Sequence, residues 1–76
     1  MQSMVWRKGN RYYALGIQYN LWGTQDVLIG WGDLHSKLGN NKFTTIQTPS
    51  ELDVIIEQVT KRRKERKYEL VRNTIQ

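Results

Sequence analysis

Apolar residues recur at every second position over residues 11–19, and this alternation is the clearest pattern in the first half of the chain. Period-two spacing predicts a β-strand with one side toward a core. The predicted core side carries Tyr13, Leu15, Ile17 and Tyr19. The opposite side is only partly apolar, so we expect it to face solvent.

Three further segments have the composition of strands. Residues 4–7 predict a short edge strand, and residues 27–31 predict a strand that ends on a tryptophan. Residues 42–47 are rich in β-formers and predict an antiparallel return. Residues 20–23 predict a hairpin loop in which Gly23 supplies a positive φ. Four strands in sequence joined in this way form a meander.

A helix start is the sharpest boundary in the chain. Thr48 is a capping residue, Pro49 occupies the first helical position, and Glu51 is the acid expected in the first turn. One apolar stripe follows, formed by Leu52, Ile55, Ile56 and Val59. We expect the helix to end at about Arg66.

Alternation after the helix, at Tyr68 and Leu70, predicts a short final strand or a docked tail. The predicted fold class is therefore α+β: an antiparallel sheet of four to five strands with one C-terminal helix packed on one face. Residues 1–76 are expected to form a single small domain with a limited core.

Composition narrows the classes of protein that fit this fold. The chain has no cysteine and one histidine, so we expect neither disulfides nor a metal or other cofactor. No apolar stretch approaches the length of about 20 residues that a membrane span needs, and the N-terminus lacks the pattern of a signal peptide. A cytoplasmic protein without membrane contact is the expectation.

The net charge of +5 is concentrated in one segment. Residues 61–67 hold six bases and one acid, while the remaining chain is balanced at six bases and six acids. A localised positive charge favours an anionic partner, with Lys61, Lys64 and Arg66 as candidate phosphate contacts. The alternative is that these cations only oppose the helix dipole and keep a small protein soluble.

Trp31 ends the strand at residues 27–31, between Gly30 and Gly32. Glycines on both sides let another molecule approach, so the ring is a candidate stacking platform for a sugar or base. The alternative is a core position, because alternation places Trp31 on the same side as Ile29.

The segment of residues 37–42 is a candidate phosphate cradle. Glycine and asparagine tolerate left-handed geometry, which can aim successive backbone amides at an anion. Lys37, Asn41 and Lys42 are the candidate side-chain contacts, and the alternative is an ordinary hairpin loop.

Catalytic motifs are absent from the chain. His35 lies between Asp33 and Ser36, but neighbours along a chain do not adopt the nucleophile–base–orienter geometry of hydrolysis. No nucleotide fingerprint, paired-histidine motif or nucleophile elbow occurs. The chain is not expected to be an enzyme.

The order of these features resembles the WGR domain, a module of DNA-dependent poly(ADP-ribose) polymerases and of small bacterial proteins. The resemblance covers residues 6–71 and rests on several segments. These are the strand at residues 11–18, the aromatic–glycine turn at 20–23, Trp31-Gly32, the basic loop at 39–42, the helix start at 50–52, and Lys64 followed by residues 68–71.

The resemblance implies an antiparallel sheet with one helix and a role in recognising DNA breaks. In the family, the motif tryptophan packs against the sugar at a strand's 5′ end, which would assign stacking to Trp31 and phosphate contact to Lys42 and Lys64. Three positions depart from the family pattern, since Asp33 replaces an arginine, and His35 and Lys67 replace glycines. Nothing resembles the transferase domain of the polymerases.

Two functions follow as expectations. The first is a non-catalytic module that binds nucleic acid, specifically DNA ends or duplex backbone, through Trp31, the basic loop and the helix end. The alternative is a module that binds a protein partner or a second copy of itself through Trp6 or Trp22.

Overall fold

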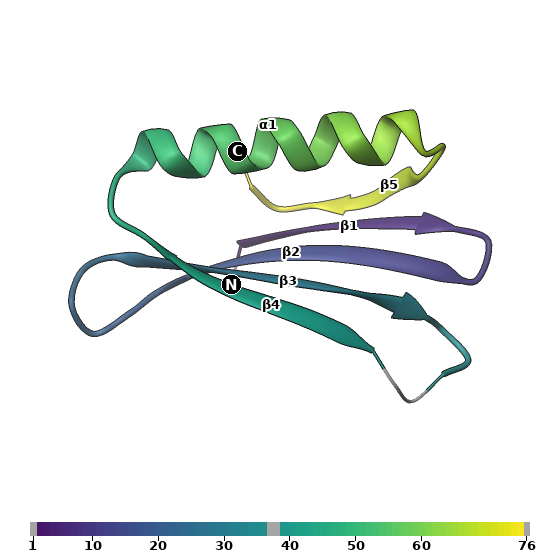
Figure 1. Cartoon of the computed structure of the whole chain (residues 1–76), viewed down its shortest axis with the longest axis horizontal. Coiled ribbons are helices and arrows are strands. Elements are labelled where there is room, and N and C mark those ends of the chain that lie inside the picture. Colours follow the sequence, from purple (N-terminus) through teal and green to yellow (C-terminus); the bar gives the residue numbers. More distant parts are fainter. Residues whose placement is uncertain (1, 37–38, 76) are drawn as a thin grey trace.

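The computed structural model describes residues 2–36 and 39–75 and shows one antiparallel sheet with one helix on it (Figure 1). The elements of this part of the chain are β1 (Gln2–Lys8), β2 (Arg11–Tyr19), β3 (Gln25–Asp33), β4 (Asn40–Ile46), α1 (Pro49–Glu65) and β5 (Glu69–Asn73). The strand order is β4-β3-β2-β1-β5, and every neighbouring pair is antiparallel. The predicted α+β class and the meander of the first four strands are confirmed.

The C-terminal segment pairs with β1, which makes β1 an inner strand of the sheet. β1 was expected at the edge of the sheet, but β5 pairs along its free side, with Trp6 opposite Leu70. The expectation of an edge strand is therefore wrong. The physical reason is that β1 would otherwise expose a row of unpaired backbone groups, which the returning chain satisfies. Of the two alternatives for the tail, the final strand is the one that forms.

The hydrophobic core lies between α1 and one side of the sheet. Its buried members are Met4, Trp6, Leu15, Ile17, Val27 and Ile46. Tyr19 was predicted on the core side but is 72% exposed, because it is the last residue of β2, next to the exposed loop at residues 20–23. Trp6 is only 3% exposed, so its predicted role as a partner anchor is wrong. Alternation along β1 places Trp6 on the side that the helix covers, and its indole packs edge-on against Tyr13.

The helix begins as its residues predict. Thr48 is the N-cap, and its Oγ1 accepts a hydrogen bond from the backbone N–H of Glu51 at 3.4 Å. Pro49 occupies the first turn, where its missing N–H costs nothing. The predicted stripe from Leu52 to Val59 packs on the core but stays half-buried, and no residue of α1 is fully buried.

The core and the hairpin tip offer a matched test of the packing. Leu15 is 0% exposed and Leu21 is 95% exposed. We expect Leu15→Ala to lower the free energy of unfolding by about 2–5 kcal/mol, because it leaves a cavity. Leu21→Ala should stay within about 0.5 kcal/mol of the wild type. Urea unfolding followed by circular dichroism measures both, and equal losses would contradict this assignment of the core.

Candidate nucleic-acid interface

The ends of several elements meet at one end of the sheet (Figure 1). The start of β2, the end of β3 and the start of β4 lie there because successive antiparallel strands reverse direction. The C-terminus of α1 and the start of β5 arrive at the same end. Residues far apart in sequence therefore face one another at this end.

Aromatic side chains form a row across the sheet at this end. Strand register places Trp6, Tyr13 and Trp31 side by side on the helix-facing side. Tyr13 and Trp31 are stacked, with ring centroids 6.1 Å apart and planes 18° apart. Trp31 is the outermost ring and remains 36% exposed. It is neither a core residue nor a free surface ring, but the accessible end of a packed row.

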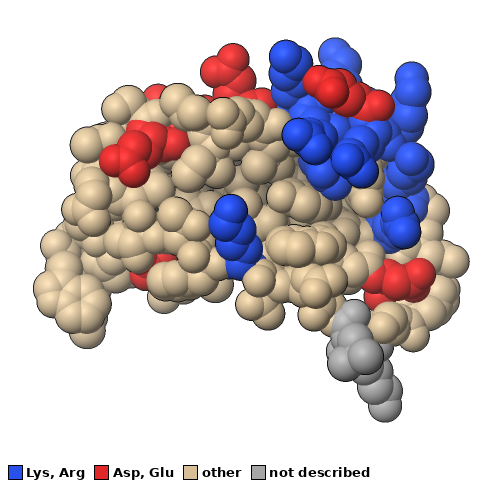
Figure 2. All heavy atoms as spheres, in the orientation of Figure 1, with Lys and Arg blue, Asp and Glu red and all other residues tan. Residues whose placement is uncertain are grey.

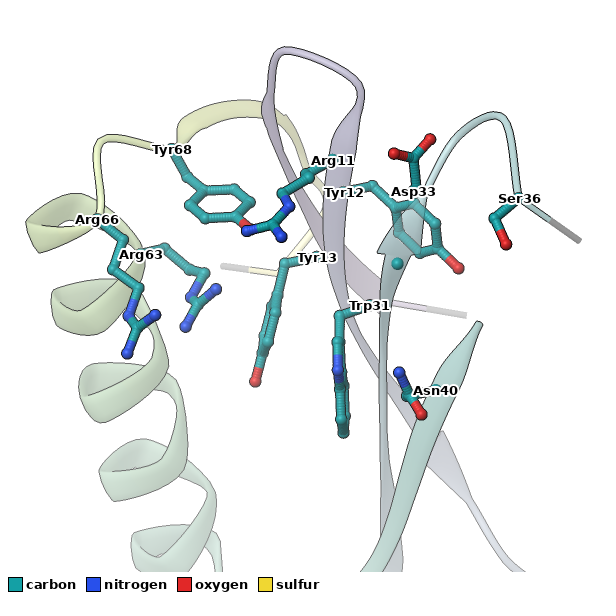
Figure 3. Close-up of a pocket in the computed structure, with 11 residues that line it drawn as sticks. Arg11, Tyr12, Tyr13, Trp31, Asp33, Ser36, Asn40, Arg63, Arg66 and Tyr68 are labelled. Carbon is teal, nitrogen blue, oxygen red and sulfur yellow. The ribbon is translucent and has the colours of Figure 1, made fainter. Parts of the chain in front are cut away.

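Arg63 of α1 closes this row from the helix side. Its guanidinium carbon lies 4.0 Å from the Tyr13 ring centroid and 4.8 Å from the Tyr68 ring centroid. Both distances are within the range of cation–π attraction, which contributes about 0.5–2 kcal/mol per contact. The Nε of Arg63 is buried and has no hydrogen-bond partner among the described residues. A fixed, incompletely satisfied cation thus lies in the same row as Trp31, with Tyr13 between them (Figure 3).

The helix C-terminus brings Tyr68 onto Arg63. Tyr68 N–H donates to the carbonyl of Arg63 at 2.9 Å, and Lys67 N–H donates to that of Lys64 at 3.1 Å. This pair of bonds defines a Schellman motif. It requires left-handed backbone at Lys67, whose φ is 67°. Glycine is the usual residue in this conformation, and lysine adopts it here.

Two open hollows adjoin the row, and Figure 3 shows the first of them. The first, which we name the Arg11 hollow, has a volume of about 630 Å³ and is lined by Arg11, Tyr12, Tyr13, Trp31, Gly32, Asp33, Ser36, Asn40, Arg63, Arg66 and Tyr68. The second, the Lys42 hollow, has a volume of about 550 Å³ and is lined by Tyr13, Val27, Ile29, Trp31, Lys42, Thr44, Ile55, Gln58, Val59, Arg62 and Arg63. Tyr13, Trp31 and Arg63 line both.

The electrostatic environment of both hollows is positive. Figure 2 shows lysine and arginine side chains gathered at one end of the molecule, over the C-terminal half of α1. Asp33 is the one acid among the described residues that line either hollow. Its carboxylate is turned away from the Trp31 ring (Figure 3), and its Oδ1 accepts a hydrogen bond from His35 N–H at 2.8 Å.

The predicted site residues separate into two groups. Trp31, Lys42 and Arg66 come together at the hollows, and Gly32 lines the Arg11 hollow. Asn41 lies on the outer side of the sheet, because its neighbour Asn40 pairs with Trp31 on the helix side. Two of the predicted bases, Lys61 and Lys64, are exposed and line neither hollow. Lys37 lies outside the described residues.

Of the predicted phosphate cradle, residues 39–42 are described and show no left-handed backbone, while residues 37 and 38 lie outside the described residues. Within residues 2–36 and 39–75, positive φ occurs only at Gly9, Gly23 and Lys67. β4 begins at Asn40, two residues earlier than expected, and includes Asn41 and Lys42. The backbone of these two residues is therefore extended. The segment therefore presents side chains, and not a concave row of amides, toward a ligand.

Gly32 also has a different role from the one expected. A Cβ at this position would lie 3.3 Å from the Tyr12 ring and its hydroxyl. Gly32 faces the outer side of the sheet, opposite Tyr12 in the β2–β3 register. Its missing side chain makes room for Tyr12 and does not expose the Trp31 ring.

Arg11, Tyr13 and Arg63 line the Arg11 hollow, although the sequence did not single them out as individual contacts. Tyr13 was expected in the core, and Arg63 only as part of the basic run. The signal for Arg63 was available in the helix periodicity. Continuing the stripe from Val59 by three, four and seven positions reaches Arg62, Arg63 and Arg66. The sheet-facing side of α1 thus changes from apolar to basic at its last two turns.

Other classes of site find no support in the described part of the chain. It contains no cluster of three or more His, Cys, Asp or Glu residues that could hold a metal ion. No helix within it is both long and apolar enough to cross a membrane. Comparison with protein-family models, curated proteins and solved structures found no match to this chain.

Glycine substitutions at two neighbouring lysines test the helix end. Lys67→Gly removes a left-handed strain of roughly 1–2 kcal/mol and adds a backbone entropy cost of roughly 0.5–1 kcal/mol. We therefore expect it to raise the free energy of unfolding, by about 0.5–1 kcal/mol. Lys64→Gly lies inside α1 and should lower it by about 1 kcal/mol. Thermal and urea unfolding measure the pair, and effects of the same sign would contradict the Schellman geometry.

Proposed function

We propose that this protein is a non-catalytic, WGR-like module that binds nucleic acid, with DNA as the partner, in the cytoplasm. One observation carries the proposal: a partly exposed tryptophan lies between two hollows, and each hollow contains arginine or lysine side chains. Proteins that hold nucleic acid without reading its sequence combine these two features, aromatic stacking and cationic contact with the backbone.

In this proposal the residues have three roles: stacking, phosphate contact and long-range attraction. Trp31 stacks on a sugar or a base, while Arg11, Lys42 and Arg66 contact phosphates. Lys61 and Lys64, exposed on the helix outside the hollows, raise the local positive potential and steer the polyanion toward the site. The confirmed sheet-and-helix fold supports a WGR-like module, because it is the fold that the resemblance implies.

A double substitution tests this proposal directly. The probe is a fluorescein-labelled DNA duplex with a single-stranded tail, which offers backbone, ends and unpaired bases together. We expect Trp31→Leu with Lys42→Gln to weaken binding at least about tenfold, since one aromatic stack alone contributes about 1–3 kcal/mol. Fluorescence anisotropy at low salt, repeated as salt is raised, measures the dissociation constant.

The matched control uses the same residue types at places far from the hollows. Trp22→Leu with Arg72→Gln changes an exposed tryptophan at the hairpin tip and an exposed arginine on β5. We expect this control to bind like the wild type. Absence of binding by the wild type at low salt, or equal losses in both double variants, would sink the proposal.

A second candidate function is a contact with another protein chain at the opposite end of the molecule. The loop between β2 and β3 exposes Leu21 and Trp22, the latter at 83%. Asn20 holds this loop in place, because its Oδ1 accepts hydrogen bonds from the backbone N–H groups of Trp22 (3.0 Å) and Thr24 (3.1 Å). A rigid loop that exposes a tryptophan loses little entropy when it binds an apolar pocket.

This candidate predicts self-association through the loop. Under it, the wild-type chain forms dimers as its concentration rises, and Leu21→Ser with Trp22→Ser remains a monomer because the apolar contact is lost. Trp31→Leu should dimerise like the wild type. Sedimentation equilibrium on nuclease-treated protein gives the masses, and a monomeric wild type at all concentrations would remove homodimerisation from consideration.

A further inference from the structure

The two hollows adjoin each other beside α1, and we call them together the groove. Their linings share Tyr13, Trp31 and Arg63, so a ligand that occupies both hollows would cross the row at its exposed end, Trp31. Arg11 and Arg66 lie on one side of this passage, and Lys42 and Arg62 lie on the other. The groove is therefore cationic at both ends and aromatic in the middle.

The shape of the groove selects between forms of nucleic acid. Trp31 lines both hollows and is 36% exposed, so part of its ring is accessible from within the groove. A duplex stacks its bases on one another and offers a base face only at its ends. A single strand turns individual bases outward and can place them against aromatic rings in a narrow positive channel.

We propose that this groove binds single-stranded nucleic acid, which rests on the proposed function and specifies its ligand. One base lies against the exposed part of Trp31. The phosphate on one side of that nucleotide contacts Arg11 and Arg66, and the phosphate on the other side contacts Lys42 and Arg62. The strand thus crosses the groove from one hollow to the other.

Arg63 has a positioning role in this arrangement. It is held between Tyr13 and Tyr68, with its guanidinium 4.0 Å from the first ring centroid. Its buried, unpaired Nε and its place in the lining of both hollows put a fixed positive charge midway along the strand. The charge attracts the backbone from either side, and the row of rings keeps Trp31 in its orientation.

Competition for one labelled probe tests the choice of ligand. The probe is fluorescein-labelled oligo(dT) of about 12 nucleotides, within the site sizes of single-strand-binding folds. The competitors, at equal nucleotide concentration, are unlabelled oligo(dT), oligo(rU) of the same length, and a relaxed, covalently closed circular duplex. We expect the single strands to compete at least about tenfold better than the circle, because only they offer a base to Trp31. The dT and rU arms show whether DNA or RNA is preferred.

The outcomes separate the single-strand inference from the proposed binding of nucleic acid in general. Equal competition by the closed circle overturns the single-strand inference and leaves nucleic-acid binding intact. If the protein binds the tailed duplex but not oligo(dT), the single-strand inference is likewise overturned and nucleic-acid binding stands. Failure to bind any of these probes overturns both the inference and the proposed function.

Two substitutions test the path of the strand. For single strands the logarithm of affinity falls with the logarithm of salt by about 0.7 per phosphate contact. We therefore expect Lys42→Gln and Arg66→Gln each to reduce the slope by about that amount, whereas Arg72→Gln, outside the groove, leaves it unchanged. If only one of these two substitutions reduces the salt slope, the strand contacts only one hollow, and the crossing path is overturned.

Fluorescence supplies a readout that does not depend on a disruptive variant. In Trp22→Phe protein the remaining indoles are Trp31 and the buried Trp6. Oligo(dT) should quench the emission through Trp31, and this quenching should disappear when Trp31→Leu is added. Circular dichroism confirms that each variant is folded, and unchanged quenching in the double variant overturns the stacking assignment.

Discussion

The stacking of Arg63 between Tyr13 and Tyr68 is the interaction that ties the C-terminal end of α1 to the sheet. It joins the last turn of α1 to the sheet at a place where the helix no longer carries apolar residues. The Schellman turn at Lys67 makes it possible, because it folds Tyr68 back over the helix end. Through this contact, one residue of α1 packs both on Tyr13 of β2 and on Tyr68, which directly precedes β5. The turn that ends the helix therefore also places Tyr68 in the lining of the Arg11 hollow.

The two ends of the molecule are specialised in opposite ways. At one end, arginine and lysine side chains surround a partly exposed indole, and the acid nearest the ring is held by a backbone hydrogen bond in the loop. At the other end, the β2–β3 loop exposes Leu21 and Trp22, while lysine and arginine gather away from it (Figure 2). The molecule is 37 Å long, so a polyanion and a protein could occupy these ends without competing.

Local rules were enough to predict the elements, but not the surroundings of the site. The strand at residues 11–19 and the Thr48–Pro49 helix start depend on neighbours in sequence, and both elements are confirmed, although Tyr19 at the strand end is exposed and not in the core. The surroundings of Trp31 depend on register between strands and on which helical turn faces it, and neither follows from composition. The position of β5 was missed for the same reason, since pairing with β1 joins residues some sixty positions apart. Arg63 was predictable in principle, because the helical stripe reaches it from Val59.

Basic residues on the sheet-facing side of α1 link stability to binding. An apolar side chain at position 62, 63 or 66 would gain roughly 1.5–3 kcal/mol if fully buried. The arginines forgo this gain, and none of the residues of α1 is fully buried. They converge on the groove only when the helix is docked, so the folded chain presents a binding site that the unfolded chain lacks. A ligand that binds only the folded state stabilises it by mass action. An anionic ligand bound at these three positions, as proposed above, would therefore offset the stability that they forgo. The small core and the cationic groove are two consequences of one helix face.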